Sequence, residues 1–296
     1  MNKRLLQLEL AETLKIISKK GVKGFYRGEV ADKIVTDMEN REGLISLQDL
    51  KEYRPVWREP LKGNFKEYEI ITMAPPSSGG IHIIQMLNIL ENFNLEELGH
   101  NSAAYAALLS EAMKFSYADR SKYLADPDFF EVPTSRLISK QYAQAIFKKI
   151  KLNKVTPSSN ILPGKLIPYE SEDTTHFSVA DSFGNVVTNT YTLNSGYGSG
   201  VVIKGTGIIM NNEMDDFVSA PGVPNQFGLL GGEANKIEPF KRPLSSMTPT
   251  LVFKDSNPII ATGSPGGSVI ITACLLYTSD AADEGLGVDL GGRRII

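Results

Sequence analysis

The stretch EDTTHFSVAD, Glu172 to Asp181, marks the point where the character of the chain changes. Two threonines follow an acidic pair, and apolar and polar residues then alternate with the period of two that indicates a strand with one buried face. The turn SFGN and a second run, VVTNTYTLN, complete the pattern of a β-hairpin. Threonine is common in strands, so the meaning of the Thr-Thr pair depends on other parts of the chain.

The composition differs on the two sides of this stretch. Residues 1–173 hold 24 of the 31 Lys and Arg residues, whereas residues 174–296 hold 17 of the 26 glycines. Helical patterns occur in the first part, which ends in a linker with three prolines. The second part is typical of strands joined by tight turns. We therefore predict a mostly helical part up to residue 173 and a β-rich part from Thr174.

The bulk properties of the chain exclude several classes of function. A net charge of −3 argues against a general nucleic-acid binder, which needs excess cationic side chains to neutralise phosphates. No apolar run reaches the 20 or so residues of a membrane helix. The single cysteine, Cys274, excludes an internal disulfide and a zinc site built from cysteines. The three histidines lie far apart and show no metal-ligand spacing, although a Ser-His-Asp triad stays open. We expect no metal and no other cofactor.

Several helices have readable ends. Ser46 and Asp49 form the pattern of a capping box, and Ser139 is expected to cap the helix that follows it. Residues 81–93, IHIIQMLNILENF, are apolar nearly all round, which predicts a buried helix. Residues 1–21 have the spacing of an amphipathic helix, and the acidic residues within them are atypical of a signal peptide.

The second part also holds motifs that identify a family. TTHFSVADSFGNVVTNTYTLN, NNEMDDF, PGVPNQFGLLGG, KRPLSSMTPT and TGSPGGS resemble, in order and spacing, the small subunit of the γ-glutamyltranspeptidases. APPSSGGIHIIQMLNILENF and EAMKFSYADRSKYLADPDF resemble the end of the large subunit. The resemblance covers about residues 5–273. It implies an α+β fold, the four-layer αββα sandwich of the N-terminal-nucleophile hydrolases, incomplete in this chain.

The resemblance gives the Thr-Thr pair a meaning. Members of this family cut their own precursor, here between Asp173 and Thr174, and the new terminal threonine becomes the nucleophile. A threonine hydroxyl is a weak nucleophile that needs a base, and a free α-amine with a pKa near 7.7–8 suits that task at neutral pH. By resemblance Thr192 orients the Thr174 hydroxyl. His176 is interpreted as a strand residue with no catalytic role.

Other site residues carry over from the same motifs. Asn194 is expected to contact the donor substrate, and Glu213 and Asp216 to hold its α-ammonium group. Ser245 and Ser246 would donate hydrogen bonds to its α-carboxylate.

Two further motifs complete the predicted site. Gly266 and Gly267 would supply backbone N–H groups to the tetrahedral intermediate, where one such donor is typically worth about 10²–10³ in rate. Phe227 would be the aromatic cover of a lid loop.

The activity implied is that of a γ-glutamyl transferase and hydrolase. It would act on glutathione and related γ-glutamyl compounds, with amino acids, peptides or water as acceptors. The two subunits of one precursor would form a heterodimer in an extracytoplasmic compartment. Two alternatives keep the fold: an acylase of β-lactam side chains and an enzyme that cuts poly-γ-glutamate.

The chain departs from the family pattern in two places. No residue is assigned to the arginine that pairs with the donor carboxylate in the family, and that arginine belongs to an upstream portion. After residue 273 the sequence no longer matches, so residues 274–296 are expected to be a non-native tail from translated adapter sequence. The predicted division is therefore 1–173, 174–273 and 274–296. A third alternative follows, in which the 296-residue polypeptide is a fragment without appreciable activity.

Overall fold

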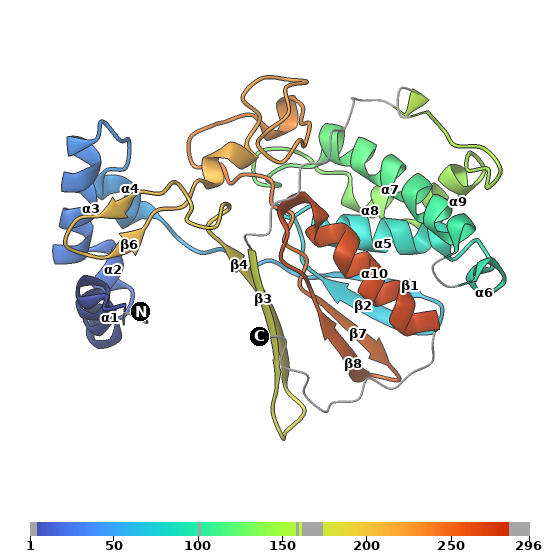
Figure 1. Cartoon of the computed structure of the whole chain (residues 1–296), viewed down its shortest axis with the longest axis horizontal. Coiled ribbons are helices and arrows are strands. Elements are labelled where there is room, and N and C mark those ends of the chain that lie inside the picture. The colour runs from blue at the N-terminus through green and yellow to red at the C-terminus, as the bar shows by residue number, and fades with distance from the viewer. Residues whose placement is uncertain (1–4, 100–101, 158–159, 162–173, 284–296) are drawn as a thin grey trace. The chain divides into compact units, whose positions relative to one another are not determined.

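The computed structural model describes residues 5–99, 102–157, 160–161 and 174–283 (Figure 1). These residues form two compact units, each built from two stretches of chain. Unit 1 comprises Met1–Trp57 and Leu193–Asn212, and unit 2 comprises Arg58–Thr192 and Glu213–Ile296. The division expected between residues 173 and 174 falls inside the range of unit 2. It refers to a cut in the chain, and that cut stays a prediction.

Unit 1 is a small helical unit with a short hairpin. Its elements are α1 (Leu8–Lys20), α2 (Lys23–Tyr26), α3 (Glu29–Asn40), α4 (Leu47–Glu52), β5 (Val202–Ile203) and β6 (Ile208–Ile209). Ser46 caps α4 through the predicted capping box with Asp49. A core of Val30, Ile34, Met38 and Ile203 holds α3 against the hairpin.

The helix α1 forms as expected but does not bury its leucines. Leu8 and Leu14 are 75% and 55% exposed, whereas Thr13 is buried and its hydroxyl donates to the Thr206 carbonyl at 2.8 Å. Thr13 therefore marks the inner face of α1 in unit 1.

Unit 2 is centred on an antiparallel sheet of order β1-β2-β7-β8. The strands are β1 (Leu61–Phe65), β2 (Tyr68–Thr72), β7 (Thr250–Lys254) and β8 (Asn257–Thr262). At the β2–β7 junction Thr72 pairs with Thr250, and their hydroxyls lie 2.9 Å apart. This pairing joins the two parts of the chain that the sequence distinguishes by composition.

Helices cover one face of this sheet. Figure 1 shows α5 (Gly79–Leu90) and α10 (Ile270–Asp283) side by side over the strands. The other helices of unit 2 are α6 (Leu95–Leu98), α7 (Ala103–Tyr123), α8 (Thr134–Leu137) and α9 (Lys140–Phe147), which Ser139 caps as expected. Every residue of α5 is buried, which confirms the prediction of a buried helix.

The predicted hairpin forms a second, two-stranded sheet. Its strands are β3 (Thr174–Ala180) and β4 (Val186–Thr192). The Ser178 and Thr188 hydroxyls donate to the carbonyls of Ala261 and Thr262 on the edge strand β8, at 3.2 and 3.1 Å. The fold is thus mixed α+β as predicted. Of the expected layers, the described residues of unit 2 show a helical layer and two sheets.

The alternation along β3 does not bury an apolar face. Phe177 and Val179 are 46% and 56% exposed, and it is the opposite face, with Ser178, that contacts β8. The expectation of one buried apolar face was therefore wrong, because polar side chains make the contact with the sheet.

The division expected at 273/274 falls inside α10. Cys274 and Leu275 are fully buried, and the Cys274 sulfur lies 3.5 Å from the Thr248 carbonyl oxygen. The foreign origin of residues 274–296 stays a prediction, and residues 284–296 lie outside the described part. In the part of the chain that the structure describes, no helix is long and apolar enough to cross a membrane.

Candidate active site

Thr174 and Thr192 lie opposite each other at the open end of the hairpin. Because β3 begins at Thr174 and β4 ends at Thr192, the antiparallel register pairs these two residues. The Thr174 hydroxyl donates to the Thr192 hydroxyl at 3.5 Å, the long limit of a hydrogen bond. A nucleophilic hydroxyl at Thr174 would have a second hydroxyl beside it. Asp173, the other side of the expected cut, lies outside the described residues.

The end of β8 and the chain that follows it run along β3 toward Thr174. It passes Ser178 at Ala261, and at Gly263 it reaches His176, where an added Cβ would lie 2.3 Å from the imidazole ring. Glycine is therefore required at 263 for this close approach. His176 itself bonds through Nδ1 to the Thr190 hydroxyl at 2.8 Å, and its lack of a catalytic role stays a prediction.

Gly266 and Gly267 follow on this path. Their φ angles are 123° and 51°, and the left-handed region favours glycine. Gly267 begins a 3₁₀ turn, Gly267–Val269, that leads into α10. Backbone N–H groups at a helix start have no partner within the helix, which suits the oxyanion role predicted for this turn.

Glu213 and Asp216 form a carboxyl pair on the short 3₁₀ segment Glu213–Asp216. Their side chains share a hydrogen bond, and burial raises the pKa of both groups above the ordinary range. The charge of Asp216 further raises the pKa of Glu213, whereas Arg120 opposes the rise at Asp216. The pair is half-buried, and a partly protonated pair of this kind gains by binding a cation, because the cation stabilises the ionised forms.

Ser245 and Ser246 are held by the loop that precedes α5. The Ser78 N–H donates to the Ser245 carbonyl at 2.9 Å, and the Ser77 hydroxyl donates to the Met247 carbonyl at 2.6 Å. An added Cβ on Gly79 would lie 2.0 Å from the Thr248 hydroxyl oxygen. The APPSSGG motif thus holds the segment of Ser245 and Ser246 in place through backbone and hydroxyl hydrogen bonds.

Asn235 connects the carboxyl pair to the serine loop. Its Nδ2 donates to the Asp216 carbonyl at 2.7 Å, and its Oδ1 accepts from the Leu244 N–H at 3.2 Å. The residue is buried. One amide therefore fixes the spacing between two segments of the predicted donor pocket.

The predicted lid loop is attached to the acidic segment. The Gln226 N–H donates to the Asp215 carboxylate at 2.8 Å, and Asn225 Oδ1 accepts from the N–H groups of Phe227 and Leu229. Phe227 is 4% exposed. Its role as an aromatic cover stays a prediction.

Asn194 is described within unit 1. It has a positive φ of 77°, is buried, and donates through Nδ2 to the Asn212 carbonyl at 3.2 Å. Its expected contact with the donor stays a prediction.

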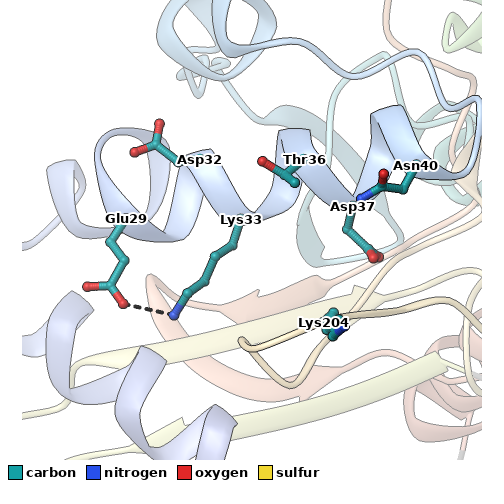
Figure 2. A pocket seen from close by; sticks show the side chains of 7 residues that line it. All are labelled: Glu29, Asp32, Lys33, Thr36, Asp37, Asn40 and Lys204. Carbon is teal, nitrogen blue, oxygen red and sulfur yellow. Dashed lines mark hydrogen bonds and ion pairs between the residues drawn. The ribbon is translucent and has the colours of Figure 1, made fainter.

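Unit 1 also contains an open hollow of about 420 Å³. Figure 2 shows its seven lining residues, with Glu29 and Lys33 joined by an ion pair of 2.8 Å. The lining residues are Glu29, Asp32, Lys33, Thr36, Asp37, Asn40 and Lys204. Over the described ranges no cluster of three or more His, Cys, Asp or Glu could hold a metal ion.

The mixed fold is that of the N-terminal-nucleophile hydrolases. The family model for γ-glutamyltranspeptidase matches residues 2–289, and the chain belongs to this family. The matched range extends past residue 273, where the motif resemblance was expected to end.

Relatives agree with this assignment. The chain is 51% identical over 284 residues to the glutathione hydrolase proenzyme of Escherichia coli strain K12, across 96% of this chain and 49% of the relative. A Helicobacter pylori γ-glutamyltranspeptidase structure matches 55% of this chain and 47% of its own, at 47% identity and a TM-score of 0.54. A Bacillus halodurans cephalosporin acylase structure matches 94% and 47%, at 28% identity and a TM-score of 0.76. The chain spans about half the length of the curated relatives it matches.

Sequence patterns did not indicate Arg120 or Asn235 as site residues. Arg120 could have been found from the sequence, because it continues the four-residue spacing of Leu108, Ala112 and Ser116 along α7. All four are buried, so an arginine on the apolar stripe of a helix was the clue. Asn235 had no comparable signal, since its two bonds join distant segments.

Proposed function

We propose that the protein is a γ-glutamyl transferase and hydrolase that cuts its own precursor before Thr174. The observation that carries the proposal is the Thr174–Thr192 hydroxyl pair at the hairpin end, in a chain of the γ-glutamyltranspeptidase family. The substrates are glutathione and related γ-glutamyl compounds, and amino acids, peptides or water act as acceptors.

The reaction follows from a threonine with a free α-amine. The amine accepts the hydroxyl proton as the oxygen of Thr174 attacks the γ-carbonyl carbon. The backbone N–H groups of Gly266 and Gly267 stabilise the oxyanion, and the proton passes to the leaving amine as the C–N bond breaks. An acceptor amine or water then attacks the γ-glutamyl ester and releases Thr174.

The donor pocket is assigned to the carboxyl pair and the serine loop. Glu213 and Asp216 bind the α-ammonium, which compensates the burial of their charge. Ser245 and Ser246 donate to the α-carboxylate, Asn194 contacts the donor, and Phe227 covers the pocket.

The organisation of the protein follows from the cut. Residues up to 173 end the large subunit, residues from Thr174 begin the small subunit, and the two remain together as a heterodimer. An extracytoplasmic location is part of the proposal. Residues 274–296 are the predicted foreign segment, and a natural gene that reads differently beyond 273 would support that assignment.

An acylase is the second candidate, because a cephalosporin acylase structure matches 94% of this chain. The carboxyl pair favours the γ-glutamyl reaction, since a donor without an ammonium group would leave two half-buried, partly desolvated carboxyl groups without a cation. Comparing an anilide of γ-glutamate with the glutaryl anilide, which lacks the amino group, separates the candidates. Faster release from the glutaryl anilide would favour the acylase.

The cleavage is tested with the protein expressed from its full natural gene. The wild type should give two bands on a denaturing gel, and Thr174→Ala should give one, because the attacking hydroxyl is lost. Thr174→Ser keeps a hydroxyl and should cut partially.

The neighbouring Thr175→Ala is the matched control and should still be cut. An alanine variant at 174 that splits at the same bond would refute self-cleavage by this hydroxyl.

A further inference from the structure

A buried arginine contacts the serine loop of the proposed donor pocket. Arg120 is on α7, and only 5% of it is exposed. Its Nε donates to the Ser78 hydroxyl at 3.1 Å, and its Nη2 donates to the Ser246 hydroxyl at 3.3 Å. The guanidinium therefore bridges α7, the loop before α5 and the serine loop.

The contact with Ser246 sets the direction of a hydroxyl. The Ser246 oxygen accepts from Arg120, so its own proton must point elsewhere. Within the described residues that proton has no acceptor. Ser78 differs, because its hydroxyl also donates, to the Ser245 carbonyl at 2.9 Å. Arg120 thus leaves Ser246 with a free donor that suits an anionic ligand.

The same cation acts on the carboxyl pair. Its positive charge lowers the pKa of Asp216 and so opposes the effect of burial. The other groups that act on Asp216 are Asp215, which raises the pKa, and Glu213, whose hydrogen bond lowers it. Without Arg120, the carboxyl of Asp216 would hold its proton to higher pH.

We propose that Arg120 is a positioning residue for the donor pocket, which turns the Ser246 hydroxyl toward the substrate carboxylate and supplies a permanent positive charge that acts on Asp216, the proposed partner of the substrate ammonium. This role rests on the proposed γ-glutamyl function of the same site. Arg120 acts through these two side chains and does not itself touch the substrate.

Neighbouring groups fit a permanent cation at this position. The imidazole of His82 stacks on Tyr117, with ring centroids 5.1 Å apart. Burial, and the charge of Arg120, lower the pKa of His82 to about 3, so it stays neutral beside the guanidinium. Arginine is the cation that resists losing its proton when buried.

The test uses the protein from its full natural gene, with a γ-glutamyl anilide as substrate and water as acceptor. Arg120→Met should raise KM about 10-fold or more and change kcat by less than about threefold. The acidic limb of its kcat/KM profile should move to higher pH, because Asp216 loses the nearby cation. Arg120→Lys keeps the charge and should leave that limb in place while raising KM less. Lys122→Met, an exposed cation on the same helix, is the matched control.

A double-mutant cycle decides the case even if Arg120→Met does not fold. Arg120→Lys and Ser246→Ala should be non-additive in KM, because both disturb the same hydroxyl. Additive effects, or a KM within twofold of wild type in a folded Arg120→Met, would overturn the proposal. A wild type without γ-glutamyl activity would instead refute the proposed function, so the two failures are distinguishable.

Discussion

The two units differ in the pKa of a carboxyl group that has a cationic side chain near it. In unit 1, Glu29 and Lys33 pair at the surface, and the hydrogen bond from Lys33 lowers the pKa of Glu29 (Figure 2). In unit 2, Asp216 lies near Arg120, yet its pKa is raised because burial outweighs the cation. A carboxylate near a cation thus has a lowered pKa in unit 1 and a raised pKa in unit 2.

The difference shows that burial, rather than the number of charges, distinguishes a site from a solvated surface. Water screens the charges of the open hollow in unit 1, and exposed ion pairs contribute little. The carboxyl pair of unit 2 is half-buried, and desolvation raises both pKa values, so a bound ammonium would change its energy more strongly. Perturbed groups of this kind are candidates for function.

The largest expected effect is on substrate binding. Asp216→Ala should raise KM for a γ-glutamyl anilide by roughly 10- to 100-fold, because a lost charge-assisted contact costs about 1.5–3 kcal/mol. Initial rates over a range of substrate concentration measure it. Asp32→Ala, an exposed carboxylate of the hollow, is the control and should leave KM unchanged. Equal changes in KM for Asp216→Ala and Asp32→Ala would show that the carboxyl pair of unit 2 is no more a substrate site than the hollow of unit 1.

A smaller effect concerns stability against pH. The pKa values of Glu213 and Asp216 are raised in the folded state, so this state binds protons more tightly than the unfolded one. Their contribution is full below the ordinary carboxyl pKa near 4, and it is lost as pH rises through the raised values. Relative to Glu213→Gln/Asp216→Asn, the acidic pair should therefore become less stabilising with rising pH.

Urea unfolding between pH 4.5 and about 8.5 measures this difference. Both proteins should carry Thr174→Ala, so that an uncut chain is compared in each case. A difference in free energy of unfolding that stays constant with pH would show that the pair titrates normally.

The smallest effect is expected at the surface pair. Glu29→Gln removes the ion pair with Lys33, whose partners are 62% and 40% exposed at their side chains. The melting temperature should fall by no more than about 2 °C, and 0.5 M salt should remove most of the difference. A loss as large as that caused by a buried substitution would show that this pair is not solvated.

Local patterns predicted much of the secondary structure. The capping box at Ser46, the cap at Ser139 and the hairpin from Thr174 to Thr192 all form as expected. Each depends on residues that are close in the chain, so their signals survive without a tertiary context. The hairpin register alone brings the Thr174 and Thr192 hydroxyls together.

The candidate site could be named from the sequence only through motifs that resemble a family. These motifs indicated Glu213, Asp216 and the serine pair, but not the groups that hold them. Chain spacing gave no reason to connect Asn235 with Asp216 or Leu244, and those contacts arise from the path of the loops.

By itself the sequence determined which residues are available: a threonine at a strand head, a glycine turn, a carboxyl pair and a serine pair. Tertiary structure decided their environment. Arg120 meets Ser246 across 126 residues, and Thr72 meets Thr250 across 178. The physical reason is that burial and charge depend on distance in space, so a shift in pKa or a fixed hydroxyl exists only once the sheet and helices have packed.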